Sequence, residues 1–201
     1  MKVLLINGSA KEKGCTFTAL SEVARGLNES GVETEILSLG TKPVADCMGC
    51  GKCRETGSCV FGDIVNEIVE KAKTADGFVF GSPVYYAHAS GRLLSVLDRA
   101  FYSGGKEFAF KPGAAVVSAR RGGTTASLEV INKHFSINQM PIVTSNYWNM
   151  VHGNTPDEVR QDKEGMRTMY NLGRNMAWMI KCIQAGPEHP QNEKESTNFI
   201  R

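Results

Sequence analysis

Four of the six cysteines in this chain lie close together in the sequence. Cys47, Cys50, Cys53 and Cys59 fall within thirteen positions, in the pattern Cys-x2-Cys-x2-Cys-x5-Cys. Four thiolates at this spacing can bind a [4Fe-4S] cluster, and the first three match the start of a bacterial ferredoxin run. A loop without metal, a zinc site and a redox-active disulfide remain open as alternatives.

A second group of reactive residues follows the first apolar run of the chain. The segment reads Gly-Ser-Ala-Lys-Glu-Lys-Gly-Cys-Thr over residues 8–16 and leads into a helical pattern. Its hydroxyls, its basic side chains and a helix N-terminus suit a phosphate. The candidate contacts are Ser9, Lys11, Gly14 and Thr16. The segment is neither a Walker A loop nor a Gly-x-Gly-x-x-Gly turn, which disfavours a nucleoside triphosphate or a dinucleotide. A tight turn without ligand is the alternative.

Two later segments could hold a flat ring and an anion. Pro83 fixes a bend directly after an apolar run, and the adjacent Tyr85 and Tyr86 follow it. Further along, Arg120 and Arg121 precede two glycines that allow a ligand to approach the backbone. Alternatively, the tyrosines only cover the edge of a sheet.

Apolar patterning indicates the elements that position these segments. Strands are predicted over Lys2–Ile6, Val32–Leu39, Gly77–Gly81, Gly113–Ser118 and Pro141–Ser145. Helices are predicted over Thr16–Asn28, 63–75, Leu93–Phe101, Ser127–Phe135 and Pro156–Gln184, the last interrupted at Gly165 and Gly173. Strands that alternate with helices predict an α/β fold, a three-layer α/β/α sandwich around a parallel sheet. Ligands of such sheets bind beyond the carboxyl ends of the strands, so the loops over 7–16, 40–62, 82–91, 119–125 and 146–155 should share one edge.

Length and composition limit the classes of function. A chain of 201 residues suits one domain, expected over residues 1–185 with a cysteine-rich insertion at 46–62 and a polar tail at 186–201. A net charge of +2 argues against nucleic acid or a membrane surface as the main partner and favours a small molecule. We find no apolar run long enough to cross a bilayer and no export signal, which predicts a cytoplasmic protein.

Several segments, taken in order, give a resemblance to a known family. They are Gly8-Ser9 with Gly14-Cys15-Thr16, Ser82-Pro83-Val84-Tyr85 with Ser90-Gly91, Leu97-Asp98-Arg99, and Gly122-Gly123. In this combination, over about residues 1–150, the chain resembles the flavodoxin-like NAD(P)H-dependent FMN reductase family. The resemblance implies a five-stranded parallel sheet in the order 2-1-3-4-5, and a homodimer or homotetramer.

The resemblance also implies where FMN binds. The phosphate would lie in the loop from Ser9 to Thr16, which includes Cys15, where similar sequences often have Asn. The ribityl chain and ring edge would contact Pro83, Val84, Tyr85 and Tyr86, and the ring would be flanked by Ser118, Arg120, Gly122 and Gly123. Asp98 and Arg99 are expected to form a structural ion pair.

The expected function is an FMN-dependent oxidoreductase. It would accept hydride from NAD(P)H and pass electrons to a quinone, a flavin or another small acceptor, without a catalytic side chain for the hydride transfer itself. The cysteine pattern resembles that of the iron–sulfur flavoproteins within this family, so one alternative is an electron carrier that uses FMN, a [4Fe-4S] cluster and ferredoxin as partner. A flavin-binding redox sensor is the other alternative.

Overall fold

The computed structural model describes residues 1–190, 193, 195–197 and 199. The predicted tail therefore falls partly outside the described residues, at 191–192, 194, 198 and 200–201. The strands are β1 (Lys2–Asn7), β2 (Glu33–Ser38), β3 (Gly77–Tyr85), β4 (His88–Ala89), β5 (Gly113–Ala119) and β6 (Met150–His152). The helices are α1 (Cys15–Glu29), α2 (Cys53–Thr56), α3 (Ile64–Ala72), α4 (Gly91–Phe108), α5 (Thr124–Ile137), α6 (Pro156–Gln161) and α7 (Lys163–Ala185).

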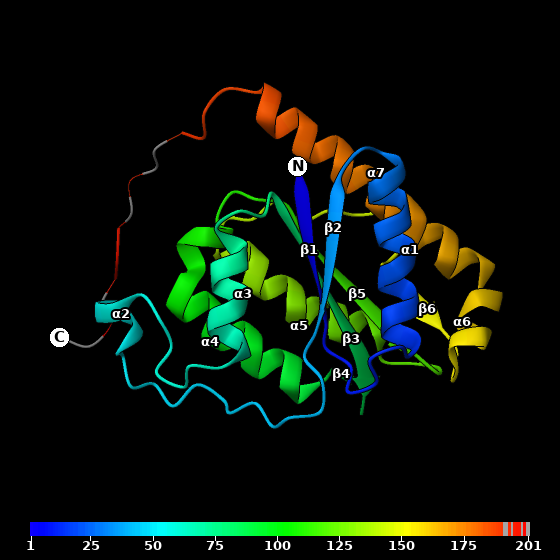
Figure 1. Cartoon of the computed structure of the whole chain (residues 1–201), viewed down its shortest axis with the longest axis horizontal. Helices are drawn as coiled ribbons and strands as arrows, with labels where there is room; N and C mark the ends of the chain where they lie inside the picture. Colours follow the sequence, from blue (N-terminus) through cyan, green and yellow to red (C-terminus); the bar gives the residue numbers. More distant parts are fainter. Residues whose placement is uncertain (191–192, 194, 198, 200–201) are drawn as a thin grey trace.

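The sheet has the predicted flavodoxin-like order. Its parallel strands run β2-β1-β3-β5-β6, and the short β4 pairs antiparallel with the end of β3. Helices cover both faces, which confirms the three-layer sandwich (Figure 1). Among the described residues, no helix combines the length and apolar character needed to cross a membrane.

Side chains of β1 alternate between the two faces of the sheet and supply both cores. Val3 and Leu5 pack with α1 and α7, whereas Leu4 and Ile6 pack with α3, α4 and α5. Each of these four side chains is fully buried, which contributes roughly 1.5–3 kcal/mol apiece. The sheet is thereby fixed in position, and with it the edge at which its strands end.

The last strand and the last helix differ from their predictions. Residues 141–145 form only one bridge, from Ile142 to Gly113, and the fifth parallel strand is β6 instead. Pro141 has no N–H to donate, and Val143 N–H bonds Gly113 O at the very start of β5. The segment therefore touches the sheet at one end before the chain turns back to pair as β6.

Helix α7 is continuous through both glycines that were predicted to interrupt it. The break falls at Asp162, whose side chain caps α7 by accepting the Gly165 N–H at 2.9 Å. Gly173 instead allows α1 and α7 to meet closely, because a Cβ there would lie 2.2 Å from Val23 O. The glycine thus serves helix packing rather than helix termination.

Candidate functional site

The N-terminus of α1 is open to a ligand. Gly14, at the N-cap, has no side chain to accept the first-turn N–H groups, and no acidic residue occupies that turn. These N–H groups carry the positive end of the helix dipole, so they suit an anion. Burial raises the pKa of the Cys15 thiol. Cys15 can therefore offer its backbone N–H without placing a negative sulfur beside that anion.

The loop before α1 is held by its own hydrogen bonds. The Ser9 N–H donates to Asn7 Oδ1 at 3.1 Å, and the Lys11 N–H donates to Ser9 Oγ at 3.1 Å. Ser9 is buried whereas Lys11 is exposed. The loop thus has a fixed backbone and two exposed cations, Lys11 and Lys13.

Two predicted contact residues meet between α1 and β5. Thr16 Oγ1 and Ser118 Oγ lie 2.8 Å apart and both side chains are buried. Thr16 belongs to the first turn of α1 and Ser118 lies near the carboxyl end of β5. The structure therefore brings the ends of β1 and β5 together, as expected for loops that share one edge of the sheet.

Hydrogen bonds also join the first and third strand ends. The Gly8 N–H donates to Gly81 O at 2.8 Å, and Ser90 Oγ donates to Gly8 O at 3.1 Å. The Ser90 N–H in turn donates to Ser82 Oγ at 2.8 Å. The segment that carries Pro83 and Val84 is therefore fixed relative to the loop before α1.

The tyrosines lie in a tight hairpin that the sequence did not predict. Tyr85 pairs with His88, and the two residues between them, Tyr86 and Ala87, have φ values of 49° and 59°. This is the conformation of a type I′ turn, which Asn and Gly favour and other residues adopt at a cost of about 1–2 kcal/mol each. Tyr86 is fully exposed at the tip and Tyr85 is partly exposed.

The loop after β5 packs directly against this hairpin. Gly123 has a φ of 94°, and a Cβ there would lie 2.4 Å from Ala87 Cα and 3.1 Å from Val84 Cγ1. Arg120 and Gly122 precede it, with Arg120 exposed. The candidate residues that follow β3 and those that follow β5 therefore lie on one surface.

These groups fit a ligand with a phosphate at one end and a planar ring at the other. The uncapped helix and the free ammonium of Lys11 suit the phosphate. The exposed tyrosines suit a planar ring that can stack on them, and Arg120 suits negative charge on that ring. Because the hydroxyls and backbone are already fixed, binding would cost little reorganisation. FMN has this combination of groups.

All four clustered cysteines line a single cavity of about 550 Å³, with Phe61 and Tyr102 among its other walls. Cys47 and Cys50 are exposed, whereas Cys53 and Cys59 are partly buried. Over the part of the chain that the structure describes, no three metal-ligating side chains lie close enough together to hold an ion. The donor set fits an iron–sulfur cluster in type and number. The four sulfur atoms do not, however, converge on one point.

A buried arginine organises this cysteine loop. Arg99, on α4, forms two hydrogen bonds of 2.8 Å with the Asp63 carboxylate and two of 3.2 and 3.3 Å with Cys59 Sγ. A further bond of 3.1 Å reaches Ala45 O, and the guanidinium lies 4.5 Å from the centre of the Phe61 ring. Burial alone would raise the pKa of Asp63, but hydrogen bonds from Arg99 and from the Val65 N–H hold it below its ordinary value.

The predicted ion pair between Asp98 and Arg99 does not form. Asp98 Oδ1 instead lies 3.0 Å from His134 Nε2, on α5. Consecutive residues of a helix point about 100° apart, so Asp98 and Arg99 cannot face each other. The only sequence signal for the real partner was the position of Asp63 at the start of α3, where it caps the helix through the Val65 N–H.

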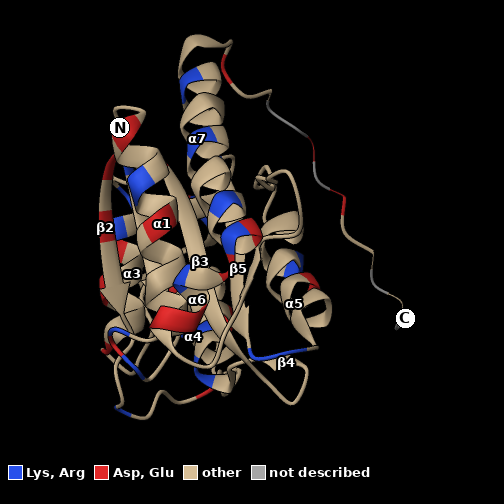
Figure 2. Ribbon diagram, turned by 90° about the vertical axis from the view of Figure 1, so that its right-hand side faces the viewer, with Lys and Arg blue, Asp and Glu red and all other residues tan. Residues whose placement is uncertain are grey.

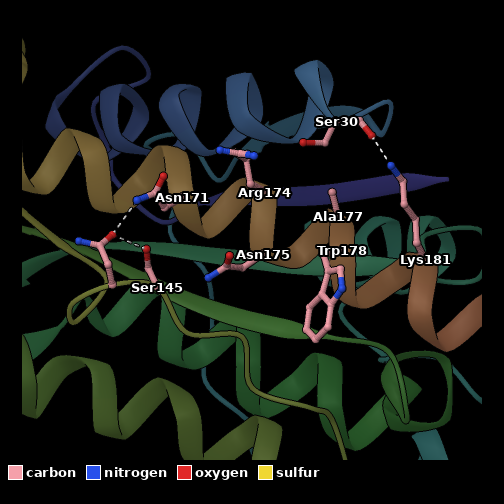
Figure 3. Close-up of a pocket in the computed structure, with 9 residues that line it drawn as sticks. Ser30, Ser145, Asn171, Arg174, Asn175, Ala177, Trp178 and Lys181 are labelled. Carbon is pink, nitrogen blue, oxygen red and sulfur yellow. Dashed lines mark hydrogen bonds between the residues drawn. The ribbon is translucent and has the colours of Figure 1, made fainter.

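Another cavity, of about 630 Å³, lies beside the C-terminal end of α1 (Figure 3). Ser30, Arg174, Trp178 and Lys181 are among its walls, and Lys181 Nζ donates to Ser30 O at 2.8 Å. It belongs to the basic side of α7, along which Figure 2 shows recurring Lys and Arg. Because α1 runs antiparallel to the strands, this cavity lies away from the edge that carries the hairpin and the phosphate loop.

Comparison with known proteins agrees with this arrangement. Residues 1–155 match the family model of NADPH-dependent FMN reductases. An iron–sulfur flavoprotein of Methanocaldococcus jannaschii is 35% identical over 192 residues, which cover 92% of this chain and 100% of that protein.

Two solved structures show the same fold. RosB with a bound 8-demethyl-8-formylriboflavin-5'-phosphate matches with a TM-score of 0.74 at 11% identity, over 100% of this chain and 92% of that one. An archaeal flavodoxin matches with a TM-score of 0.62 at 14% identity, over 90% and 99% of the two chains. At these identities the likeness concerns the fold alone.

Proposed function

The chain belongs to the NADPH-dependent FMN reductase family, in its iron–sulfur flavoprotein-like branch, and from this premise we propose how it works as a flavin oxidoreductase. The loops at the carboxyl edge of the sheet would hold FMN, which would supply the chemistry to pass electrons from NAD(P)H hydride to a small acceptor. The observation that carries this proposal is the contact of Thr16 with Ser118, which joins a phosphate-binding helix N-terminus to the strand end beside the ring.

The phosphate is held mainly by backbone. The N–H groups of Cys15 and Thr16 point from the uncapped turn of α1, with the hydroxyls of Ser9 and Thr16 beside them. Lys11 adds an exposed cation of this loop. Because the donors are largely main-chain groups, replacing Asn by Cys at position 15 leaves the phosphate site intact.

The ring is oriented by the hairpin and the loop after β5. Pro83, Val84, Tyr85 and Tyr86 line the ribityl chain and one ring edge. Ser118, Arg120, Gly122 and Gly123 flank the ring on the other side, where backbone N–H groups and Arg120 favour negative charge on it. The protein therefore positions the ring and tunes its charge, and needs no side chain to transfer a proton.

An absorption spectrum of the purified full chain after incubation with FMN tests this proposal. Bound flavin with shifted visible bands, bleached by NADPH under anaerobic conditions, is the expected result. A chain that shows no flavin bands after incubation would contradict the proposal as a whole.

A second candidate function is electron transfer through a [4Fe-4S] cluster held by Cys47, Cys50, Cys53 and Cys59, with ferredoxin as partner. It is favoured by the single cavity that all four thiols line and by the buried Arg99 beside Cys59. Assays of iron and labile sulfide on anaerobically purified protein test it. Flavin without iron or sulfide, also after reconstitution, would exclude the cluster and leave the flavin reductase.

A further inference from the structure

The four thiols that share one cavity differ in how firmly the chain holds them. Cys59 is fixed at both its backbone and its sulfur. Its N–H donates to Asn66 Oδ1 at 3.0 Å, and Asn66 Nδ2 donates to Cys59 O at 2.9 Å. The sulfur accepts two hydrogen bonds from Arg99. Cys59 is therefore held in a defined place by Asn66 of α3 and Arg99 of α4.

Cys47 and Cys50 lie on a segment with almost no polar support. Among the described residues, the only hydrogen bond that reaches residues 42–50 runs from Arg99 Nη1 to Ala45 O, at 3.1 Å. Val44 packs against the core, whereas both cysteines are exposed. A segment with few buried contacts and few hydrogen bonds opens and moves at low cost.

The backbone of this segment also permits a large change of direction. Gly49 and Gly51, on either side of Cys50, have φ values of 66° and 72°, and nothing lies within 4 Å of a Cβ built at either position. Cys53 follows at the start of α2, where its sulfur lies 3.7 Å from Tyr102 O. The chain on either side of Cys50 can thus turn without displacing a packed neighbour, whereas Cys53 is held beside α4.

Arg99 touches both parts of the loop at once. Its side chain is 1% exposed, and its five hydrogen bonds are shared among Asp63, Cys59 and Ala45. A buried guanidinium needs such a complete set of partners to offset its lost hydration. One side chain, Arg99, therefore positions both Cys59 and the segment over residues 42–50, through Ala45. Asp63 holds Arg99 in place.

We propose that Arg99 is the positioning residue of the four-cysteine site: it presents Cys59 as the preset ligand and anchors the segment on which Cys47 and Cys50 close toward Cys53 and Cys59 over a metal centre. The closure over a metal centre rests on the second candidate function. The anchoring of Cys59 by Arg99 does not depend on it.

Site-resolved alkylation of the metal-free full chain tests the anchoring. In the wild type we expect Cys59 to react about tenfold more slowly than Cys47 and Cys50, because Arg99 and Asn66 hold it in a partly buried place whereas the other two are exposed. The test variant is R99Q/D63N, which removes the buried charge pair together and retains an N-cap at position 63, since Asn also caps helices. It should bring the rate of Cys59 to within about threefold of the other two.

Arg92→Gln is the matched control for this variant. Arg92 lies on the same helix and donates to the carbonyls of Gly40 and Thr41, but it touches no thiol. The control should leave Cys59 protected. Equal reactivity of Cys59 and Cys47 in the wild type, or protection of Cys59 that survives in R99Q/D63N, would overturn the anchoring role. Circular dichroism checks folding, and R99K, which retains the charge beside Asp63, replaces R99Q/D63N if that variant is unfolded.

Anaerobic reconstitution with ferrous iron and sulfide tests the closure. The wild type and R92Q should take up about four irons per chain, and R99Q/D63N less than about one. Equal iron content in wild type and R99Q/D63N would overturn the positioning role. A wild type that binds no iron would overturn the closure together with the cluster, whereas the alkylation pattern would still decide whether Arg99 anchors Cys59.

Discussion

The hydroxyls of Thr16 and Ser118 meet at 2.8 Å in the buried space between the first turn of α1 and the end of β5. The two residues are 102 positions apart in the chain, so the contact exists only because the sheet brings the two strand ends together. A pair of buried hydroxyls that satisfy each other leaves the nearby N–H groups of α1 free for a ligand. This contact therefore sets where a phosphate can approach.

Thr16→Asp should weaken the binding of FMN by about tenfold or more, because it places a second negative charge at the phosphate. Fluorescence titration of FMN measures the dissociation constant. Ser21→Asp adds the same charge further along α1 and should change the affinity much less. Equal affinities of Thr16→Asp and wild type for FMN would contradict the placement of the phosphate in this loop.

Gly123→Ala should destabilise the protein and weaken FMN binding, because the new Cβ would lie 2.4 Å from Ala87 Cα at a φ of 94°. We expect a loss of about 2–4 kcal/mol in the free energy of unfolding, from the unfavourable φ and the overlap. Gly122→Ala is the control, since nothing lies within 4 Å of a Cβ at that position. Urea unfolding compares the two, and similar losses in both would show that the hairpin contact is unimportant.

The pair of Asp63 and Arg99 should make stability depend on acid pH. The pKa of Asp63 is lower in the folded chain than its ordinary value, so the folded state favours the carboxylate. This contribution is fully present above the ordinary aspartate pKa of about 3.9 and is lost as the pH falls through the folded value. The difference in Tm between wild type and Asp63→Asn should stay constant from neutral pH to about pH 5 and shrink below about pH 4. A difference that does not change with pH would contradict the ion pair.

Gly173→Ala should separate α1 from α7. A Cβ at this position would lie 2.2 Å from Val23 O, so the gain in helix propensity is outweighed by the overlap. We expect a loss of about 1–3 kcal/mol in the free energy of unfolding. Gly91→Ala, also helical but with nothing within 4 Å of a Cβ, should be neutral or stabilising. Thermal unfolding of the two variants gives the comparison, and a stabilised Gly173→Ala would refute the close contact.

The first four parallel strands could be predicted because each strand is a short apolar run followed by a helical pattern. The order of the sheet was implied by the family resemblance. The fifth could not, since β6 is only three residues long and pairs with β5 late in the chain. The hairpin at Tyr86 and Ala87 was missed for a different reason. Neither residue is one that a type I′ turn favours, so the turn is imposed by its contact with Gly123 and not by local preference.

The loop before α1 could be identified as a candidate site because hydroxyls, lysines and a helix start lie within a few residues of each other. The partner of Arg99 could not be identified, because Asp63 is 36 positions away. Sequence neighbours suggested Asp98 instead, which faces His134. Long-range pairs of buried charges depend on helix rotation and packing, which no local pattern reports.

The contact of α1 with α7 limits how far this chain can be truncated. The family model ends at residue 155, yet α7 supplies Met169, Leu172, Met176, Ala177 and Ile180 to the core on that face of the sheet. A fragment trimmed to the matched segment would expose the apolar side of α1 and leave one face of the sheet half covered. The segment that the family model matches is therefore shorter than the unit that packs as one core.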